Sequence, residues 1–163
     1  MQKQEEKRLI EDFGVHLEQK EELSPLAARI YATLILQVGS GITFEELVRD
    51  LEASKSSIST NLKMLSQLNL IEYTTKCGDR KKYYRVPDDQ VYRVIDRKIT
   101  TWEKELSLHE RVYNYKKDKA EQLNPETPVD LKYNQLFIQY AQSMIEGLTN
   151  IKHKLKDNSI END

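Results

Sequence analysis

Apolar residues recur every three or four positions over most of the chain, which is the spacing of one face of an α-helix. A first amphipathic helix is predicted over residues 2–20, and its apolar face consists of Leu9, Ile10, Phe13 and Leu17. Ser24 followed by Pro25 is an N-cap and first-turn pair that begins a second helix. Its predicted buried stripe consists of Ala27, Ile30, Tyr31, Leu34, Ile35 and Val38. The segment 39–41 (GSG) is expected to end it.

Two further helices are predicted by their caps. Thr43 and Glu46 have the spacing of a capping box and begin a helix of about two turns. Ser54 is another N-cap, for a helix that runs to about residue 68. The inward side of that helix is predicted to consist of Ile58, Leu62 and Leu65.

A β-hairpin is predicted next. The segments 70–76 (LIEYTTK) and 81–86 (KKYYRV) are rich in β-branched and aromatic residues, which favour strands. The residues between them, 77–80, include the glycine that a hairpin turn favours. Pro87 closes this block, whose order is helix, helix, helix, hairpin.

The remainder of the chain predicts two long helices. The first, over about 88–122, carries a heptad-like seam of Tyr92, Ile95, Ile99, Trp102, Leu106, His109 and Tyr113. Two prolines in 124–128 (NPETP) predict a break between the helices. The last helix, over about 130–157, has an apolar face of Tyr133, Phe137, Tyr140, Met144, Leu148, Ile151 and Leu155. Such seams predict a homodimer, with packing of the first, fifth and sixth helices within one chain as the alternative.

Composition limits the class of protein. A chain of 163 residues, 38% hydrophobic and 32% charged, can form one full core or two very small ones, but not a large multidomain enzyme. It has no apolar run of about 20 residues and no apolar segment at its start, so we expect a cytoplasmic protein with no membrane partner. Cys77 and three scattered histidines predict no metal, no cofactor and no enzymatic activity.

The near-neutral net charge of −2 conceals a basic segment. Residues 54–85 hold seven basic and two acidic residues, a net of +5, whereas residues 1–53 have −5 and residues 86–163 have −2. A positive field on a capped helix and a hairpin suits a phosphate backbone. The outward side of the helix is small, polar and free of carboxylates, which suits a major groove. An ordinary solvent-facing surface is the alternative interpretation.

Three segments together resemble one family of regulators. The segments 23–36 (LSPLAARIYATLIL), 42–72 (ITFEELVRDLEASKSSISTNLKMLSQLNLIE) and 78–86 (GDRKKYYRV) resemble the MarR superfamily of bacterial regulators, and its GbsR-like branch most. The resemblance covers residues 23–87. It implies a mainly α fold with a small β-hairpin: a winged helix-turn-helix DNA-binding domain at 23–87, flanked by dimerisation helices at 1–22 and 88–158.

The resemblance also implies a function and a site. The protein is expected to be a homodimeric transcriptional regulator, a repressor, that binds double-stranded DNA with the helix 54–68 in the major groove and the wing 71–86 in the minor groove. Arg80 or Lys81 would read the minor groove, and Asp79 would hold the arginine or the loop. The expected DNA-binding residues are Lys55, Ser56, Ser57, Ser59, Thr60, Lys63, Gln67, Arg80, Lys81 and Lys82.

Two further interpretations stay open. Tyr92, Trp102 and Tyr113 are candidates for an aromatic pocket that binds a choline-like effector through cation–π attraction, although their core spacing favours simple packing. The alternative function is a winged-helix protein-interaction module without sequence-specific DNA binding. Such a module would have a neutral helix and wing, and the net charge of +5 argues against it.

Overall fold

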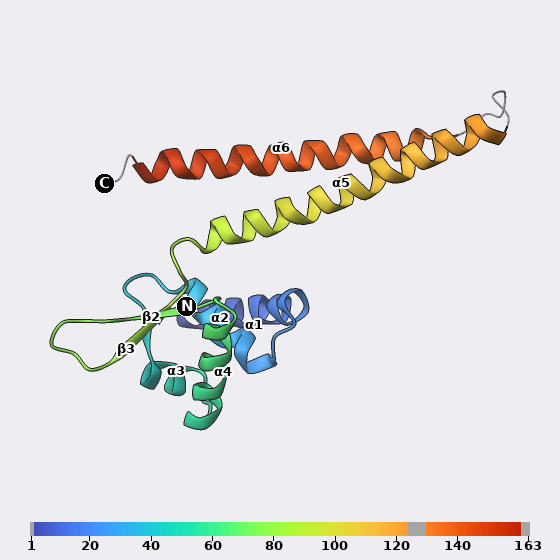
Figure 1. The fold of residues 1–163 in the computed structure, drawn as a ribbon. Helices are drawn as coiled ribbons and strands as arrows, with labels where there is room; N and C mark the ends of the chain where they lie inside the picture. The colour runs from blue at the N-terminus through green and yellow to red at the C-terminus, as the bar shows by residue number, and fades with distance from the viewer. Residues whose placement is uncertain (1, 124–129, 161–163) are drawn as a thin grey trace. The chain divides into compact units, whose positions relative to one another are not determined.

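The computed structural model describes residues 2–123 and 130–160 (Figure 1). The chain forms two compact units, residues 1–90 and 91–163, and each is considered by itself. The predicted break at 124–128 lies outside the described residues.

The first unit has a winged-helix fold. Its elements are α1 (Gln2–Glu21), α2 (Pro25–Leu36), β1 (Ile42–Thr43), α3 (Phe44–Asp50), α4 (Lys55–Gln67), β2 (Glu72–Thr75) and β3 (Lys82–Arg85). The three strands form an antiparallel sheet in the order β1-β3-β2. Helix α4 packs against α2 and α3, and the β2–β3 hairpin, called the wing below, projects to one side of the helices (Figure 1). The mainly helical fold predicted from the sequence is therefore confirmed.

The predicted caps are confirmed. The Ser24 hydroxyl accepts a hydrogen bond from the Ala27 N–H, and the Ser54 hydroxyl accepts one from the Ser57 N–H. Thr43 and Glu46 form a complete capping box. These caps fix where α2, α3 and α4 begin, so the helices bury one continuous core. Its members from the three helices include Ala27, Ile30, Tyr31, Leu34, Leu47, Ile58, Leu62 and Leu65.

The predicted stripe of α2 is too long. The helix ends at Leu36 because Gln37 adopts an extended conformation, so Val38 lies beyond the helix and is 93% exposed. Ile35 is on the outer side of the last turn and is also exposed.

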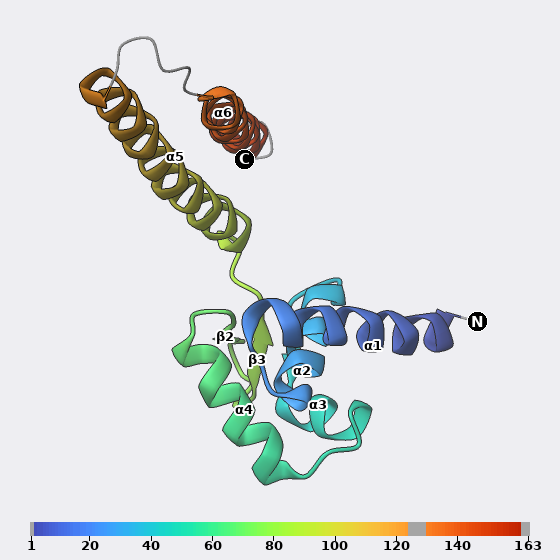
Figure 2. The ribbon, with the colours of Figure 1, turned by 90° about the vertical axis from the view of Figure 1, so that its right-hand side faces the viewer.

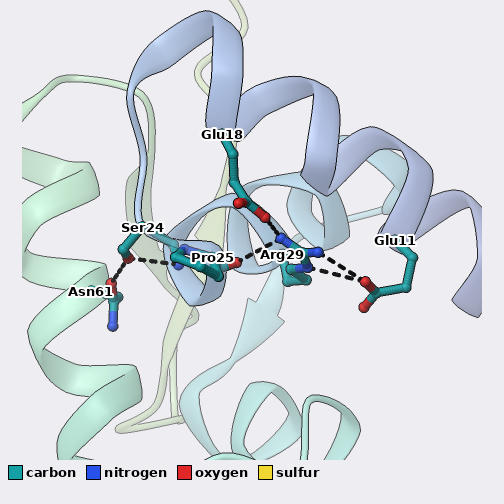
Figure 3. Close-up of polar contacts among 7 residues, drawn as sticks. Glu11, Glu18, Ser24, Pro25, Arg29 and Asn61 are labelled. Carbon is teal, nitrogen blue, oxygen red and sulfur yellow. Dashed lines mark hydrogen bonds and ion pairs between the residues drawn. The ribbon is translucent and has the colours of Figure 1, made fainter.

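Helix α1 lies across α2 with a narrower apolar contact than predicted (Figure 2). Leu17 is buried and Ile10 is partly buried against the core, but Leu9 and Phe13 are exposed. Part of the contact is polar. Figure 3 shows that the Arg29 guanidinium reaches from α2 to the carboxylates of Glu11 and Glu18 on α1.

The third strand, β1, was not predicted. Its two residues pair with β3, Ile42 opposite Tyr84 and Thr43 opposite Tyr83. Two residues are too few to show the alternation by which a strand is recognised in a sequence. The pairing with a distant segment creates this strand.

The second unit is a pair of antiparallel helices, α5 (Gln90–Leu123) and α6 (Lys132–Ile160). Trp102 contacts Tyr140 with ring centroids 5.2 Å apart, and His109 stacks on Phe137 at 3.7 Å. The predicted seam of α5 is confirmed, since all seven of its residues are buried or half-buried. No helix in the described ranges combines the length and apolarity needed to cross a bilayer.

The predicted face of α6 is partly wrong. Tyr133 is 67% exposed, and Tyr140 and Ile151 are about half exposed, whereas Asn134 and Ala141 are buried. Apolar residues occupy two sides of α6, so their spacing does not show which side meets α5. The buried position of Asn134 is compatible with its polarity because its Oδ1 accepts a hydrogen bond from Lys116 Nζ at 3.1 Å.

Candidate nucleic-acid interface

Helix α4 is oriented by its apolar side and by a polar link to α2. Ile58, Leu62 and Leu65 bury one side of α4 in the core. Ser24 Oγ, at the start of α2, donates to Asn61 Oδ1 at 2.9 Å, as Figure 3 shows. Because one serine both caps α2 and bonds to α4, the two helices are held in a defined register. The opposite side of α4 faces solvent.

Six of the seven α4 residues predicted to meet DNA lie on that exposed side. They are Lys55, Ser56, Ser59, Thr60, Lys63 and Gln67. Ser57 differs, since it is half-buried and its hydroxyl lies 2.8 Å from that of Ser54. Its side chain therefore belongs to the helix cap. The exposed side has no carboxylate, because residues 55–67 contain none.

The wing exposes its cations near the tip and neutralises the one at its base. The exposed cations include three residues that were predicted to contact DNA, Arg80, Lys81 and Lys82. Arg85, at the end of β3, lies 2.7 Å from a Glu72 carboxylate oxygen and 3.2 Å from one of Asp88. Its charge is balanced locally, so the net charge of the basic segment resides on α4 and on the outer part of the wing.

Asp79 holds the loop at the wing tip. Its carboxylate accepts hydrogen bonds from the Lys81 N–H at 2.9 Å and from the Tyr83 hydroxyl at 2.8 Å. These bonds, the backbone one most, lower the pKa of Asp79, and the bond to Asp79 raises the pKa of Tyr83. Asp79 is thus a charged acceptor at neutral pH. It was expected to hold either Arg80 or the loop, and these two bonds connect it to the loop.

A groove of about 430 Å³ separates α4 from the wing. Ser59, Lys63 and Gln67 line it from α4, and Tyr73 and Lys82 line it from the wing. The structure therefore brings four of the predicted residues to one concave surface. Two of them are lysines contributed from opposite walls of the groove.

Lys76 and two wing tyrosines, Tyr73 and Tyr83, have contacts that the sequence did not predict. Lys76 Nζ lies 3.9 Å from the centroid of the Tyr83 ring, and Lys82 Nζ lies 4.0 Å from that of Tyr73. Both distances are within the range of cation–π attraction. The composition of the two strands suggests such contacts, but only the strand register shows which lysine meets which ring.

The three candidate effector residues all belong to one helix. Tyr92, Trp102 and Tyr113 lie along α5, and the first and last are about 31 Å apart at the 1.5 Å rise of a helix. Trp102 packs on Tyr140, and the Tyr113 hydroxyl accepts a hydrogen bond from Gln135 Nε2 at 3.3 Å. Trp102 and Tyr113 thus contact α6, as the packing interpretation expects, and the effector pocket stays a prediction.

Comparisons of the sequence and of the fold with known proteins each find a transcriptional regulator. No protein-family model matches the chain. Over 77 residues the chain is 36% identical to the HTH-type transcriptional regulator MmpR5 of Mycobacterium tuberculosis (strain ATCC 25618 / H37Rv), a segment that covers 47% of this chain and 46% of that relative. The match thus spans about half of the relative's length. A crystal structure of a transcriptional regulator has the same fold, with a TM-score of 0.53 and 23% identity over 94% of this chain and 99% of the other.

Proposed function

We propose that this chain is a DNA-binding transcriptional regulator that acts as a homodimer. Helix α4 enters the major groove, and the wing reaches the adjacent minor groove. The observation that carries the proposal is the shared groove, which α4 lines with a carboxylate-free side and the wing lines with Lys82. The naming of MmpR5 as an HTH-type transcriptional regulator supports the general class.

The charge distribution supports DNA as the ligand. Lys55 and Lys63 on α4 are exposed, as are the cations of the wing tip. Lysine and arginine side chains that replace condensed counterions provide most of the affinity for duplex DNA, while hydroxyl and amide groups on a helix read base edges. Ser59, Thr60 and Gln67 are the residues that we assign to base contacts.

The second unit supports the homodimer. Helix α6 leaves a stripe of apolar residues exposed on one side, namely Tyr133, Leu136, Tyr140 and Ile151. Helix α5 exposes Leu108, Val112 and Tyr115 at spacings of four and three. Among the described residues of this unit, α5 and α6 leave these side chains exposed, and a second copy would cover both sets by symmetry. Two α4 helices would then meet half-sites about 34 Å apart, one turn of DNA.

The finer assignment follows the resemblance of residues 23–87. We propose the GbsR-like branch of the MarR superfamily, repression as the direction of regulation, and Arg80 as the side chain that enters the minor groove. The hydrogen bonds of Asp79 support this choice, because they fix the loop and leave the Arg80 side chain exposed.

The salt dependence of DNA binding tests the proposal. We expect the protein to bind a labelled random-sequence duplex at low salt, with a logarithmic affinity that falls linearly as the logarithm of salt concentration rises. Replacing Arg80, Lys81 and Lys82 together by Ala should reduce the slope by up to about 2.7, because each phosphate contact contributes about 0.9. Fluorescence anisotropy across about 50 to 200 mM salt measures this slope.

A matched control removes the same charge from the second unit. Lys104, Lys117 and Lys119 are exposed on α5, and replacing all three by Ala should leave the slope within experimental error. Equal slopes for the wild type and the wing variant would exclude the wing from the interface. A wild-type protein without affinity for duplex DNA at low salt would instead favour a protein-interaction module.

A further inference from the structure

The two lysine–tyrosine contacts of the wing follow from the strand register. Tyr73 lies opposite Tyr84, which is two residues from Lys82 along β3. Thr74 lies opposite Tyr83, and Lys76 is two residues beyond Thr74, so Lys76 and Tyr83 have the same diagonal offset. Diagonal neighbours on one face of an antiparallel pair are within reach when a side chain is long or aromatic. Each lysine therefore meets a ring from the other strand.

The two contacts lie on opposite faces of the hairpin. Successive residues of a strand alternate between faces, so Tyr73 and Lys82 share one face, while Lys76 and Tyr83 share the other. The first face lines the groove beside α4. The second face is turned away from that groove, and the hydrogen bond to Asp79 fixes the Tyr83 ring there.

We infer that Tyr73 and Tyr83 are positioning residues that hold Lys82 and Lys76 on opposite faces of the wing, where the lysines contact the phosphates of the two strands that border a minor groove. The inference rests on the proposed function and adds Lys76 to the interface. On this inference, each of the two faces of the wing contacts a phosphate.

The physical reason is preorganisation. A free lysine side chain samples many rotamers and loses that freedom when it binds a phosphate. A ring that already restricts the side chain reduces this loss, and the ammonium still has donors directed away from the ring. The competing explanation is that the lysine stems only cover the apolar rings and contribute to the stability of the hairpin.

A double-mutant cycle on duplex binding separates the two explanations. We expect Tyr73→Leu to weaken binding about two- to five-fold without changing the salt slope, because the lysine charge is retained. Tyr73→Phe should restore the wild-type affinity, since it keeps the ring. In a Lys82→Ala background, Tyr73→Leu should have no further effect.

Lys76→Ala gives an independent readout that does not depend on any tyrosine variant. Lys76 is exposed, so its truncation leaves the fold intact, and the salt slope should fall by about 0.9 for one lost phosphate contact. The probe is the same random-sequence duplex, and circular dichroism verifies that each variant is folded.

Two results would overturn the inference while leaving DNA binding in place. One is a loss on Tyr73→Leu that is equally large with and without Lys82, which indicates a structural role. The other is a wild-type salt slope for Lys76→Ala. Absence of any wild-type binding would overturn the proposed function itself, and this inference with it.

Discussion

Glu46 illustrates how a single residue can determine where an element begins. Its Oε2 accepts hydrogen bonds from the Thr43 N–H at 2.8 Å and from the Thr43 hydroxyl at 2.6 Å. These bonds, the side-chain one most, lower the pKa of Glu46. They also fix the start of α3, directly after the two residues of β1 that pair with the wing.

The first prediction concerns the charge of Glu46. A carboxylate with a lowered pKa in the folded state contributes stability that is fully present above its unfolded pKa of about 4.3 and is lost as the pH falls through the folded pKa. Glu46→Gln should lower the free energy of unfolding by about 1 kcal/mol at neutral pH. The difference from wild type should shrink below about pH 4. Urea denaturation at several pH values measures it.

Glu45→Gln is the matched control for this prediction. Glu45 lies in the same first turn of α3 but is exposed and outside the capping box. Its replacement should cost only a few tenths of a kcal/mol, through the helix dipole. A loss for Glu46→Gln that does not change with pH would contradict the assigned role.

At the scale of elements, α1 and α2 are joined through one guanidinium. Arg29 Nη2 lies 2.9 Å from Glu11 Oε2, Nη1 contacts Glu18, and Nη1 also donates to the Pro25 carbonyl (Figure 3). The arginine side chain crosses α1 at Gly14, where a Cβ would be 3.1 Å from two of its atoms. This close approach explains why residue 14 is a glycine. The polar contacts of Arg29 add to the small apolar contact that Leu17 and Ile10 make with the core.

The second prediction tests that link. Arg29→Met should lower the free energy of unfolding by about 1 to 2 kcal/mol, because the hydrogen bonds to charged partners are lost at a side chain that is only 18% exposed. Arg29→Lys should recover only part of the loss, since an ammonium cannot reproduce the planar fork.

The exposed Arg49–Asp50 pair provides the comparison for Arg29. Arg49 lies 2.9 Å from Asp50, but its side chain is mostly in solvent. Arg49→Met should therefore stay within about 0.5 kcal/mol of wild type. Equal losses at the two arginines, measured by chemical denaturation, would show that the α1–α2 link contributes no more than a surface ion pair.

At the scale of the whole molecule, the fold consists of two units that differ in how they bury their apolar side chains. The first unit has its own core of residues from α1 to β3. In the described residues of the second unit, α5 and α6 are joined by ring contacts and by the Lys152–Asp96 ion pair, and apolar side chains are exposed on both helices. Its stability is thus expected to depend on association with another copy.

The third prediction tests this association. Ile151 is about half exposed on the outer stripe of α6, and Ile151→Glu should weaken self-association at least about tenfold by placing a charge in an apolar interface. His153→Glu, two residues further and exposed on another side of the helix, should not. Sedimentation equilibrium over a range of concentrations measures both. A monomeric wild type would contradict the homodimer.

Local signals predicted the parts of the fold that depend on neighbouring residues. Each of the three caps forms between residues three positions apart, and the inward side of α4 follows from the spacing of its apolar residues. The sequence alone was therefore sufficient to predict them. The rotation of α6 was not predictable, because apolar residues on two of its sides give no preference until α5 is placed. The contacts of Lys76 and Asp79 depend on strand register and on turn geometry, which the spacing of residues alone does not define.

The Glu72–Arg85 pair at the base of the wing has a consequence for approach to any polyanion. Because the root of the hairpin is neutral and its tip is cationic, the hairpin is an electric dipole whose positive end points outward. In the electric field around a polyanion, this dipole experiences a torque that turns its positive end toward the anion. The charges of the hairpin therefore favour an approach with the tip foremost.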